Sequence, residues 1–294
     1  MKSITLTAVL MFAGAAAGFS QVQPRPLASV FGPKLAASLT FTDSAPVSNL
    51  VANATSDANT TISQNTWVEI KGVNLAPSIL DWSTATSFAQ GLLPTSVNGV
   101  SATVNNKPAF IYYTNPAQVN ILTPIDSALG GGITVTLTTP FGTTSKTVTM
   151  VQNSLGLFTA NFTGNLYPSA YHAINTCATT YNGICLLGPD TLYPGLSTPA
   201  VPGETIVLFG NGFGQVNPPI VNGAAFPPQT TLPTLPVVTI GGLPAKVDYA
   251  ALVAAGEYQF NVEVPTGAPN GDNLMTMTYN GASIQSNVYI SVKK

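Results

Sequence analysis

The sequence is poor in charge. Lys, Arg, Asp and Glu make up only 7% of its 294 residues, and nine basic residues against eleven acidic ones leave a formal net charge of -2. Soluble domains usually carry about a quarter charged residues. No basic cluster occurs that could neutralise phosphates or bind an acidic membrane surface, so we expect no nucleic-acid partner.

The residues that most often carry chemistry are also scarce. The chain has one histidine, His172, and two cysteines, Cys177 and Cys185. A catalytic triad would need His172 as its base, but no G-x-S-x-G nucleophile elbow occurs, and we interpret His172 as a loop residue. Two cysteines and one histidine are an incomplete zinc-ligand set. We therefore predict a protein that is not an enzyme, with no cofactor and no metal site.

Long apolar runs are missing as well, apart from the N-terminus. Residues 1–20 place one lysine before an apolar run that ends in small residues, the order of a secretory signal peptide. An uncleaved membrane anchor is the alternative interpretation. We expect residues 21–39, which are punctuated by proline, to be a linker. The protein is then secreted or held at the cell surface, with no membrane span after signal cleavage.

The two cysteines favour a local disulfide. In an exported chain, Cys177 and Cys185 with seven residues between them in a loop that contains Gly and Asn suit such a bond. Two free thiols and a metal site are the alternatives.

Short runs rich in Val, Ile, Thr, Tyr and Phe begin near residue 40, and Gly, Pro and Asn clusters separate them every ~8 to 12 residues, a pattern typical of an all-β sandwich. In "GEYQFNVEVP" the side chains alternate, so we expect Tyr258, Phe260, Val262 and Val264 to line one buried face. We expect no helix beyond one short turn over residues 250–256.

The strand pattern occurs twice. "WVEIKGVNL" from Trp67 aligns with "TIVLFGNGF" from Thr205, and "QVNILTP" from Gln118 aligns with "QFNVEVP" from Gln259. Four blocks keep their order with offsets of about 136 to 141 residues. We therefore predict two tandem β-domains, residues 40–153 and 198–294, with residues 154–197 as a connector.

A paired Gln-x-Asn motif recurs in both copies, as Gln118 with Asn120 and as Gln259 with Asn261. One interpretation is a repeated ligand contact. We favour a structural role, in which the amides bond backbone groups of the preceding loop, since a copy in each domain suits a requirement of the fold.

Three motifs in the second copy resemble a known family. "PAVPGETIVLFGNGFG", "VTIGGLPAKVDYA" and "YQFNVEVP" over residues 198–294 are similar to a C-terminal domain family of exported Acidobacteria proteins, such as those of Solibacter, which is itself similar to the IPT/TIG immunoglobulin-like fold. The first copy resembles it more loosely and has Gln64-Asn65-Thr66 in place of the P-G-E turn. The resemblance implies two tandem Ig-like β-sandwiches in an extracellular setting, with no recognised catalytic activity and no active-site residues.

Other candidate sites have simple structural interpretations. We expect Glu204, Glu257 and Glu263 to be solvated surface carboxylates, because Glu257 and Glu263 stand about 20 Å apart on one extended strand and cannot form a catalytic pair. The glycines of "FGNGFG" are not followed by a helix, so we assign them to turn positions with positive φ or to a bulge.

Aromatic residues in loops are the candidates for recognition, since Tyr and Trp there stack on sugars or anchor a partner. They are Trp82, Phe88, Tyr167, Tyr171, Tyr181 and Tyr193. The alternative is that they fill the gap between the domains.

Together these observations predict a secreted, non-catalytic surface, adhesion or extracellular binding module whose partner is a surface glycan or another extracellular protein. The first alternative is an extracellular polysaccharide-active enzyme or a carbohydrate-binding accessory protein. The second is a structural spacer or a self-assembling coat subunit.

Overall fold

The computed structural model describes residues 44–85, 91–174, 177 and 179–294, so the predicted signal peptide, the predicted linker and Phe88 lie outside the described residues. The described residues contain β-strands and one 3-10 turn, η2 (Trp82–Thr84), and no α-helix. The predicted all-β fold class is thereby confirmed. No helix within these ranges is long and apolar enough to cross a membrane.

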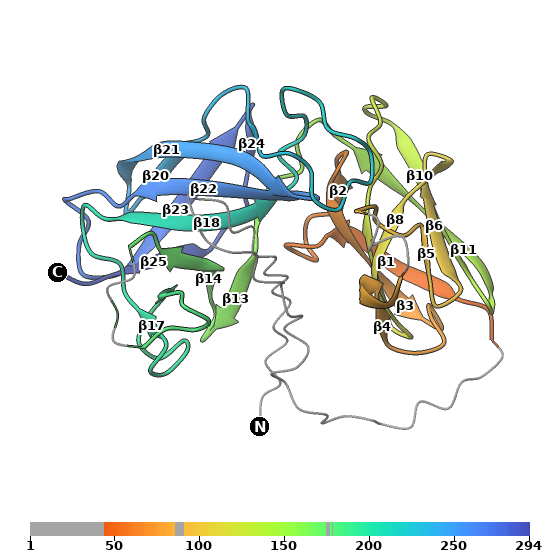
Figure 1. The fold of residues 1–294 in the computed structure, drawn as a ribbon, viewed down its shortest axis with the longest axis horizontal. Helices are drawn as coiled ribbons and strands as arrows, with labels where there is room; N and C mark the ends of the chain where they lie inside the picture. Colours follow the sequence, from red (N-terminus) through yellow and green to blue (C-terminus); the bar gives the residue numbers. More distant parts are fainter. Residues whose placement is uncertain (1–43, 86–90, 175–176, 178) are drawn as a thin grey trace.

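The first half of the chain, residues 44–153, forms two sheets (Figure 1). One has the order β1 (Val47–Asn53), β3 (Trp67–Val73), β9 (Gln118–Leu122), β8 (Phe110–Asn115) and β4 (Leu80–Asp81). The other has the order β2 (Thr61–Ile62), β11 (Gly142–Met150), β10 (Gly132–Thr139), β6 (Val100–Val104) and β5 (Ser96–Val97), with β7 (Lys107–Pro108) paired to β6. One apolar cluster, which includes Ile70, Ile111, Ile121 and Leu137, fills this half.

The second half, residues 154–294, forms one sheet of fourteen strands that lies beside the first half in Figure 1. Its main path runs through β13 (Thr159–Phe162), β14 (Asn165–Pro168), β25 (Val288–Val292), β23 (Gly271–Tyr279), β20 (Val237–Ile240), β21 (Leu243–Ala254), β22 (Glu257–Glu263), β18 (Thr205–Asn211), β15 (Ala170–His172), β16 (Leu186–Leu187) and β17 (Ser197–Thr198). Three short strands pair off this path: β12 (Gly156–Leu157), β19 (Thr230–Thr231) and β24 (Ala282–Ser283).

Strand β22 confirms the predicted alternation. Tyr258, Phe260, Val262 and Val264 are each 0% exposed and belong to the apolar core of the second half. Phe213 packs on this row, with its ring centroid 4.5 Å from that of Phe260. The helical turn expected over residues 250–256 is wrong, because residues 250–254 continue strand β21 and pair with β22.

The two halves use the same strand pairing. β3 pairs antiparallel with β9, and β18 pairs antiparallel with β22. The register also repeats, since Lys71 lies opposite Gln118 and Phe209, at the aligned position, lies opposite Gln259. The division into domains at residues 40–153 and 198–294 stays a prediction. The segment expected as a connector, residues 154–197, carries six strands, β12 to β17, that pair within the sheet of the second half.

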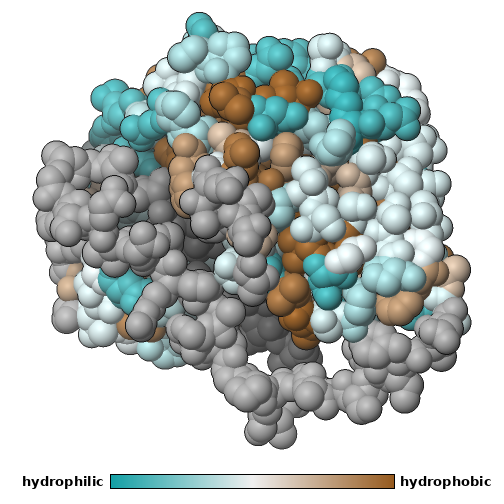
Figure 2. Space-filling model, turned by 45° about the vertical axis from the view of Figure 1, so that its right-hand side comes forward, coloured by the Kyte–Doolittle hydropathy of each residue, from teal (hydrophilic) through white to brown (hydrophobic). Residues whose placement is uncertain are grey.

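The surface carries apolar side chains in small separate patches, which Figure 2 shows as brown areas among pale and teal ones on one face. Val237, Leu274 and Phe226 are among the large apolar residues that are more than 40% exposed. Scattered exposed apolar residues of this kind are ordinary for a folded chain.

Candidate functional site at the junction of the two halves

Two of the aromatic residues predicted to recognise a ligand are buried, and three are half-buried. Trp82 is only 8% exposed and Tyr167 only 3%, while Tyr171, Tyr181 and Tyr193 are half-buried. Trp82 and Tyr171 belong to an apolar cluster between the halves, whereas the Tyr167 hydroxyl donates to Asp272 Oδ2 at 2.6 Å. The sequence interpretation that such residues fill the gap between the domains therefore describes Trp82 and Tyr171 better than ligand contact does.

The repeated Gln-x-Asn motif makes the same bond in both halves. Gln118 Nε2 donates to Asn120 Oδ1 at 2.7 Å, and Gln259 Nε2 donates to Asn261 Oδ1 at 2.9 Å. Residues two apart on a strand point to the same face, so the two amides lie side by side. The expected bonds to backbone groups of the preceding loop are replaced by this side-chain pair.

The first copy of the motif lies beside two acids and a lysine. Gln118 Nε2 also donates to Glu69 Oε2 at 3.3 Å, and Lys71 Nζ lies 3.2 Å from Glu69 Oε1 and 2.5 Å from Asp57 Oδ1. Burial, followed by the hydrogen bond to Asp57, raises the pKa of Glu69 to about 8. Glu69 is 3% exposed, so it holds a proton where an exposed glutamate would not.

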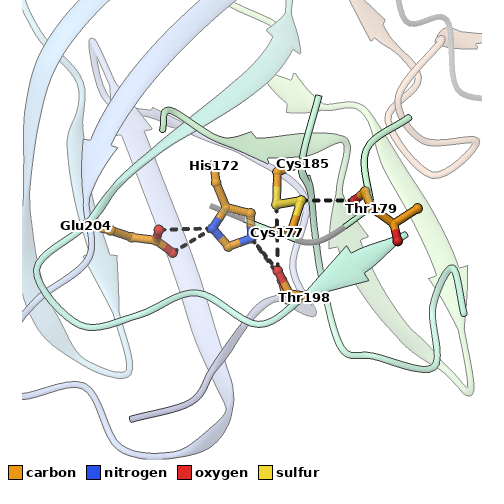
Figure 3. The surroundings of a disulfide bond; sticks show 6 residues. All are labelled: His172, Cys177, Thr179, Cys185, Thr198 and Glu204. Carbon is orange, nitrogen blue, oxygen red and sulfur yellow. Dashed lines mark hydrogen bonds and ion pairs between the residues drawn. A yellow bond between two sulfur atoms is a disulfide. The ribbon is translucent and has the colours of Figure 1, made fainter. Parts of the chain in front are cut away.

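The predicted disulfide between Cys177 and Cys185 is confirmed, and it lies close to His172 (Figure 3). His172 is 3% exposed on strand β15, so its interpretation as a loop residue is wrong. Its Nδ1 lies 2.9 Å from Glu204 Oε2, and its Nε2 lies 3.0 Å from Thr198 Oγ1 and 3.1 Å from the Thr198 carbonyl oxygen.

This histidine ties three segments of the second half together. Glu204 Oε1 also accepts from the backbone N–H of Val201 at 2.7 Å, so the carboxylate belongs to a bonded turn rather than to solvent. A general base needs a ring nitrogen free to take a proton from a nucleophile. Nε2 of His172 already faces a backbone carbonyl, and this arrangement supports a structural tie.

A polar cleft of about 670 Å³ lies where the two halves meet. Its lining comes from the first half, from the start of the second half and from the segment before β25; it comprises Ser56, Ala58, Asn59, Thr61, Val151, Asn153, Ser154, Leu155, Asn161, Gly164, Leu166, Ala282, Ser283, Ile284, Gln285, Ser286 and Asn287. Ten of these seventeen described residues carry an amide or hydroxyl side chain, and none carries a charge or an aromatic ring. The cleft therefore offers neutral hydrogen-bonding groups.

Hydrogen bonds fix the walls of this cleft. Asn59 Nδ2 donates to Ser154 Oγ at 3.1 Å, and Asn153 Nδ2 donates to the Phe213 carbonyl at 2.6 Å. Gln285 accepts from the Leu157 N–H at 2.9 Å and donates to the Leu157 carbonyl at 2.5 Å. The walls are held in place before any ligand arrives, and exposed Asn161, Ser283 and Ser286 are left facing solvent.

Buried amides join the two halves beside the cleft. Asn211 is 0% exposed, and its side chain bonds both the N–H and the carbonyl of Trp67 at 2.9 Å. Its Nδ2 also donates to Asn53 Oδ1 at 3.0 Å, while Asn53 Nδ2 donates to the Ser154 carbonyl at 2.5 Å. Gly212 follows with φ +83°, and a Cβ there would strike the Ser154 carbonyl. The assignment of the "FGNGFG" glycines to positive φ is confirmed at Gly212 and Gly214 and is wrong at Gly210, which lies within strand β18.

An apolar cluster continues this junction. It combines Trp67, Trp82, Leu93 and Leu122 of the first half with Phe158, Val207, Phe209 and Ala255 of the second, among others. Trp67 packs edge-on against Trp82 and Tyr112, with ring centroids 5.6 and 5.7 Å apart, and its Nε1 donates to the Ala255 carbonyl at 2.8 Å.

Glu257 is the residue whose environment differs most from expectation. It is 1% exposed and neither carboxylate oxygen has a hydrogen-bond partner among the described residues, so its interpretation as a surface carboxylate is wrong. Burial raises the pKa of Glu257 well above its usual range. The one sequence signal was its place as first residue of a strand after a glycine turn, which does not distinguish a buried acid from an exposed one.

The described residues define an all-β protein whose first half packs two sheets around one apolar cluster. A scan against protein-family models finds no match, and a search of the curated proteins finds none either. Among solved structures, SGBP-B from a complex xyloglucan utilization locus in Bacteroides uniformis is 14% identical over 84% of this chain and 49% of that chain, with a TM-score of 0.24.

Two further solved structures have similarly low sequence identities and TM-scores. The extracellular region of plexin A4 is 12% identical over 84% of this chain and 18% of that chain, with a TM-score of 0.26. SGBP-B from the Bacteroides ovatus mixed-linkage glucan utilization locus, solved with a mixed-linkage heptasaccharide, is 12% identical over 84% and 44%, with a TM-score of 0.22. The chain thus spans less than half of the length of each of these three proteins, and at these scores the likenesses carry no argument about a ligand.

Proposed function

We propose that the protein is an exported, non-catalytic binding module that holds an uncharged polysaccharide chain in the polar cleft between its halves. The observation that carries this proposal is the cleft lining, which is rich in amide and hydroxyl groups and has no charged side chain among its described residues. Neutral hydroxyl-rich ligands match such groups, whereas a charged polymer would leave its charges desolvated and unpaired.

Two further features support it. The disulfide Cys177–Cys185 suits an oxidising compartment outside the cytosol, in agreement with the signal peptide expected over residues 1–20 and with the resemblance of residues 198–294 to exported Acidobacteria domains. Glycoside hydrolysis needs a pair of carboxyl groups that flank the ligand, and the described residues that line the cleft include no Asp or Glu. Retention of the ligand without turnover is therefore the activity that this lining supports.

The test is a glycan array that carries neutral and anionic polysaccharides, with chromogenic glycosides assayed in parallel. We expect retention of one or more neutral glycans and release of no chromophore. Asn161→Asp and Ser283→Asp place a charge at exposed positions of the lining and should abolish retention. Thr134→Asp, at an exposed position on strand β10 outside the cleft, is the matched control and should bind like the wild type.

Three results would count against the proposal. Binding to no neutral glycan, equal binding by the two cleft variants and the wild type, or turnover of a glycoside would each contradict it. Retention of an extracellular protein in place of any glycan would assign the cleft to the other class of partner.

A further inference from the structure

Glu257 follows a turn that the first half of the chain holds in place. Trp67 Nε1 donates to the carbonyl of Ala255, two residues before Glu257. Gly256 has φ +66°, and a Cβ there would lie 2.6 Å from Leu122 Cδ1 and 2.8 Å from Trp67 Nε1. The β21–β22 turn is therefore pressed against the first half, and Glu257 begins its strand directly behind this contact.

The surroundings of the carboxyl group offer it no compensating charge. Tyr112 on β8 of the first half and Tyr171 on β15 of the second half are the titratable groups that interact electrostatically with Glu257. Asp81 acts on Tyr112 as well, so the ionised forms of all these groups are negative. On the adjacent strands, its pairing partner Ala254 and the nearby Gly210 do not titrate. An anion at Glu257 would have neither a cation nor a hydrogen-bond donor among the described residues around it.

Physical chemistry makes such a site sensitive to protonation. A neutral carboxylic acid tolerates an apolar surrounding far better than an unpaired carboxylate does. Below the ordinary glutamate pKa the acid is protonated whether the halves are closed or apart, so the closure equilibrium does not change with pH in that range. Above it, the separated halves release the proton while the closed halves retain it. Closure therefore weakens as the pH rises, by up to about tenfold in its equilibrium constant per pH unit.

We propose that Glu257 is a proton-operated latch between the two halves: they pack closed while its carboxyl group holds a proton, and they loosen when that proton leaves. The latch acts at the cluster of Trp67, Trp82 and Phe209, and this inference does not rest on the proposed function.

The chain provides its own reporter for a test. Its only two tryptophans, Trp67 and Trp82, are both in this cluster and are 3% and 8% exposed. We expect the tryptophan emission of the wild type to shift to longer wavelength as the pH rises from 5 to 9, while the far-UV circular dichroism of the strands is kept. Small-angle scattering should show an increase in the radius of gyration over the same range.

The decisive variant is Glu257→Gln, which keeps the shape and removes the titration. It should hold the emission and the radius of gyration at their low-pH values up to pH 9. Glu263→Gln, on the same strand but half-buried, is the matched control and should titrate like the wild type. If Glu257→Gln fails to fold, Glu257→Leu provides a second neutral side chain of similar size.

A wild type without an emission shift between pH 5 and 9 would overturn the latch. An unchanged shift in the folded Glu257 variants, or a shift that is accompanied by loss of the strand signal in the wild type, would overturn it as well.

Discussion

Truncation of Trp67 tests whether the junction cluster stabilises the whole chain. The substitution Trp67→Ala removes a side chain that is 3% exposed and packs against Trp82 and Tyr112. Replacing a buried Trp by Ala costs about 3–5 kcal/mol, from lost transfer free energy and from the cavity. Trp67→Phe keeps a ring but leaves the Ala255 carbonyl without its donor, and this costs about 1–3 kcal/mol. The expected order of stability is wild type, then Trp67→Phe, then Trp67→Ala.

Urea denaturation followed by far-UV circular dichroism measures these free energies of unfolding. Val237→Ala removes apolar atoms from a side chain that is 67% exposed, and as a control it should change the free energy by less than about 0.5 kcal/mol. If Trp67→Ala is no less stable than Val237→Ala, the contact between the halves contributes nothing and the reasoning from burial fails.

Three further predictions follow from single contacts. Reduction of Cys177–Cys185 should lower the free energy of unfolding, because it returns conformational entropy to the unfolded chain, and the short closed loop limits the loss to about 2–3 kcal/mol. Equal melting temperatures with and without reductant would contradict this. Gly212→Ala combines positive φ with a clash against Ser154, so it should destabilise more than Gly281→Ala, which has a similar φ and open space, and equal losses in urea would refute the close approach. Glu69 binds its proton more tightly when the chain is folded, so its contribution to the free energy of unfolding is fully present below pH 4.5 and is lost as the pH rises to about 8. The slope is at most about 1.4 kcal/mol per pH unit, and Glu69→Gln should remove it. A stability profile unchanged by that substitution would count against the raised pKa.

Features set by local alternation or by sequence spacing could be predicted. The period-two pattern of β22 fixes which side chains enter the core, because a slip by one residue would expose Tyr258 and Phe260. The spacing of Cys177 and Cys185 predicted their bond for a similar reason, since a short loop keeps the two thiols close. Both patterns are local, and the structure confirms both.

Features that depend on contacts between distant segments could not be predicted. Residues 154–197 have short strands without clear alternation, and β15 is a strand because β18 pairs with it. Glu257 is polar, and polarity indicated solvent. The turn before it packs against Trp67 and Leu122, which are distant in the sequence, and no local pattern shows that contact. The aromatic residues in loops were similarly ambiguous, because Trp82 is buried by side chains of both halves.

The junction also bears on whether the chain can continue the same contact into a larger assembly. A head-to-tail interface propagates only if each unit presents both contacting surfaces. Trp67 and Leu122 of the first half contact the β21–β22 turn of the second, and at the aligned positions the second half has Thr205 and Glu263, which are polar and half-buried. A further copy that offered its own turn to Thr205 and Glu263 would meet a hydroxyl and a carboxylate instead of an indole and an aliphatic side chain. The apolar surface that receives the turn in the first half is therefore not repeated at the aligned positions of the second half.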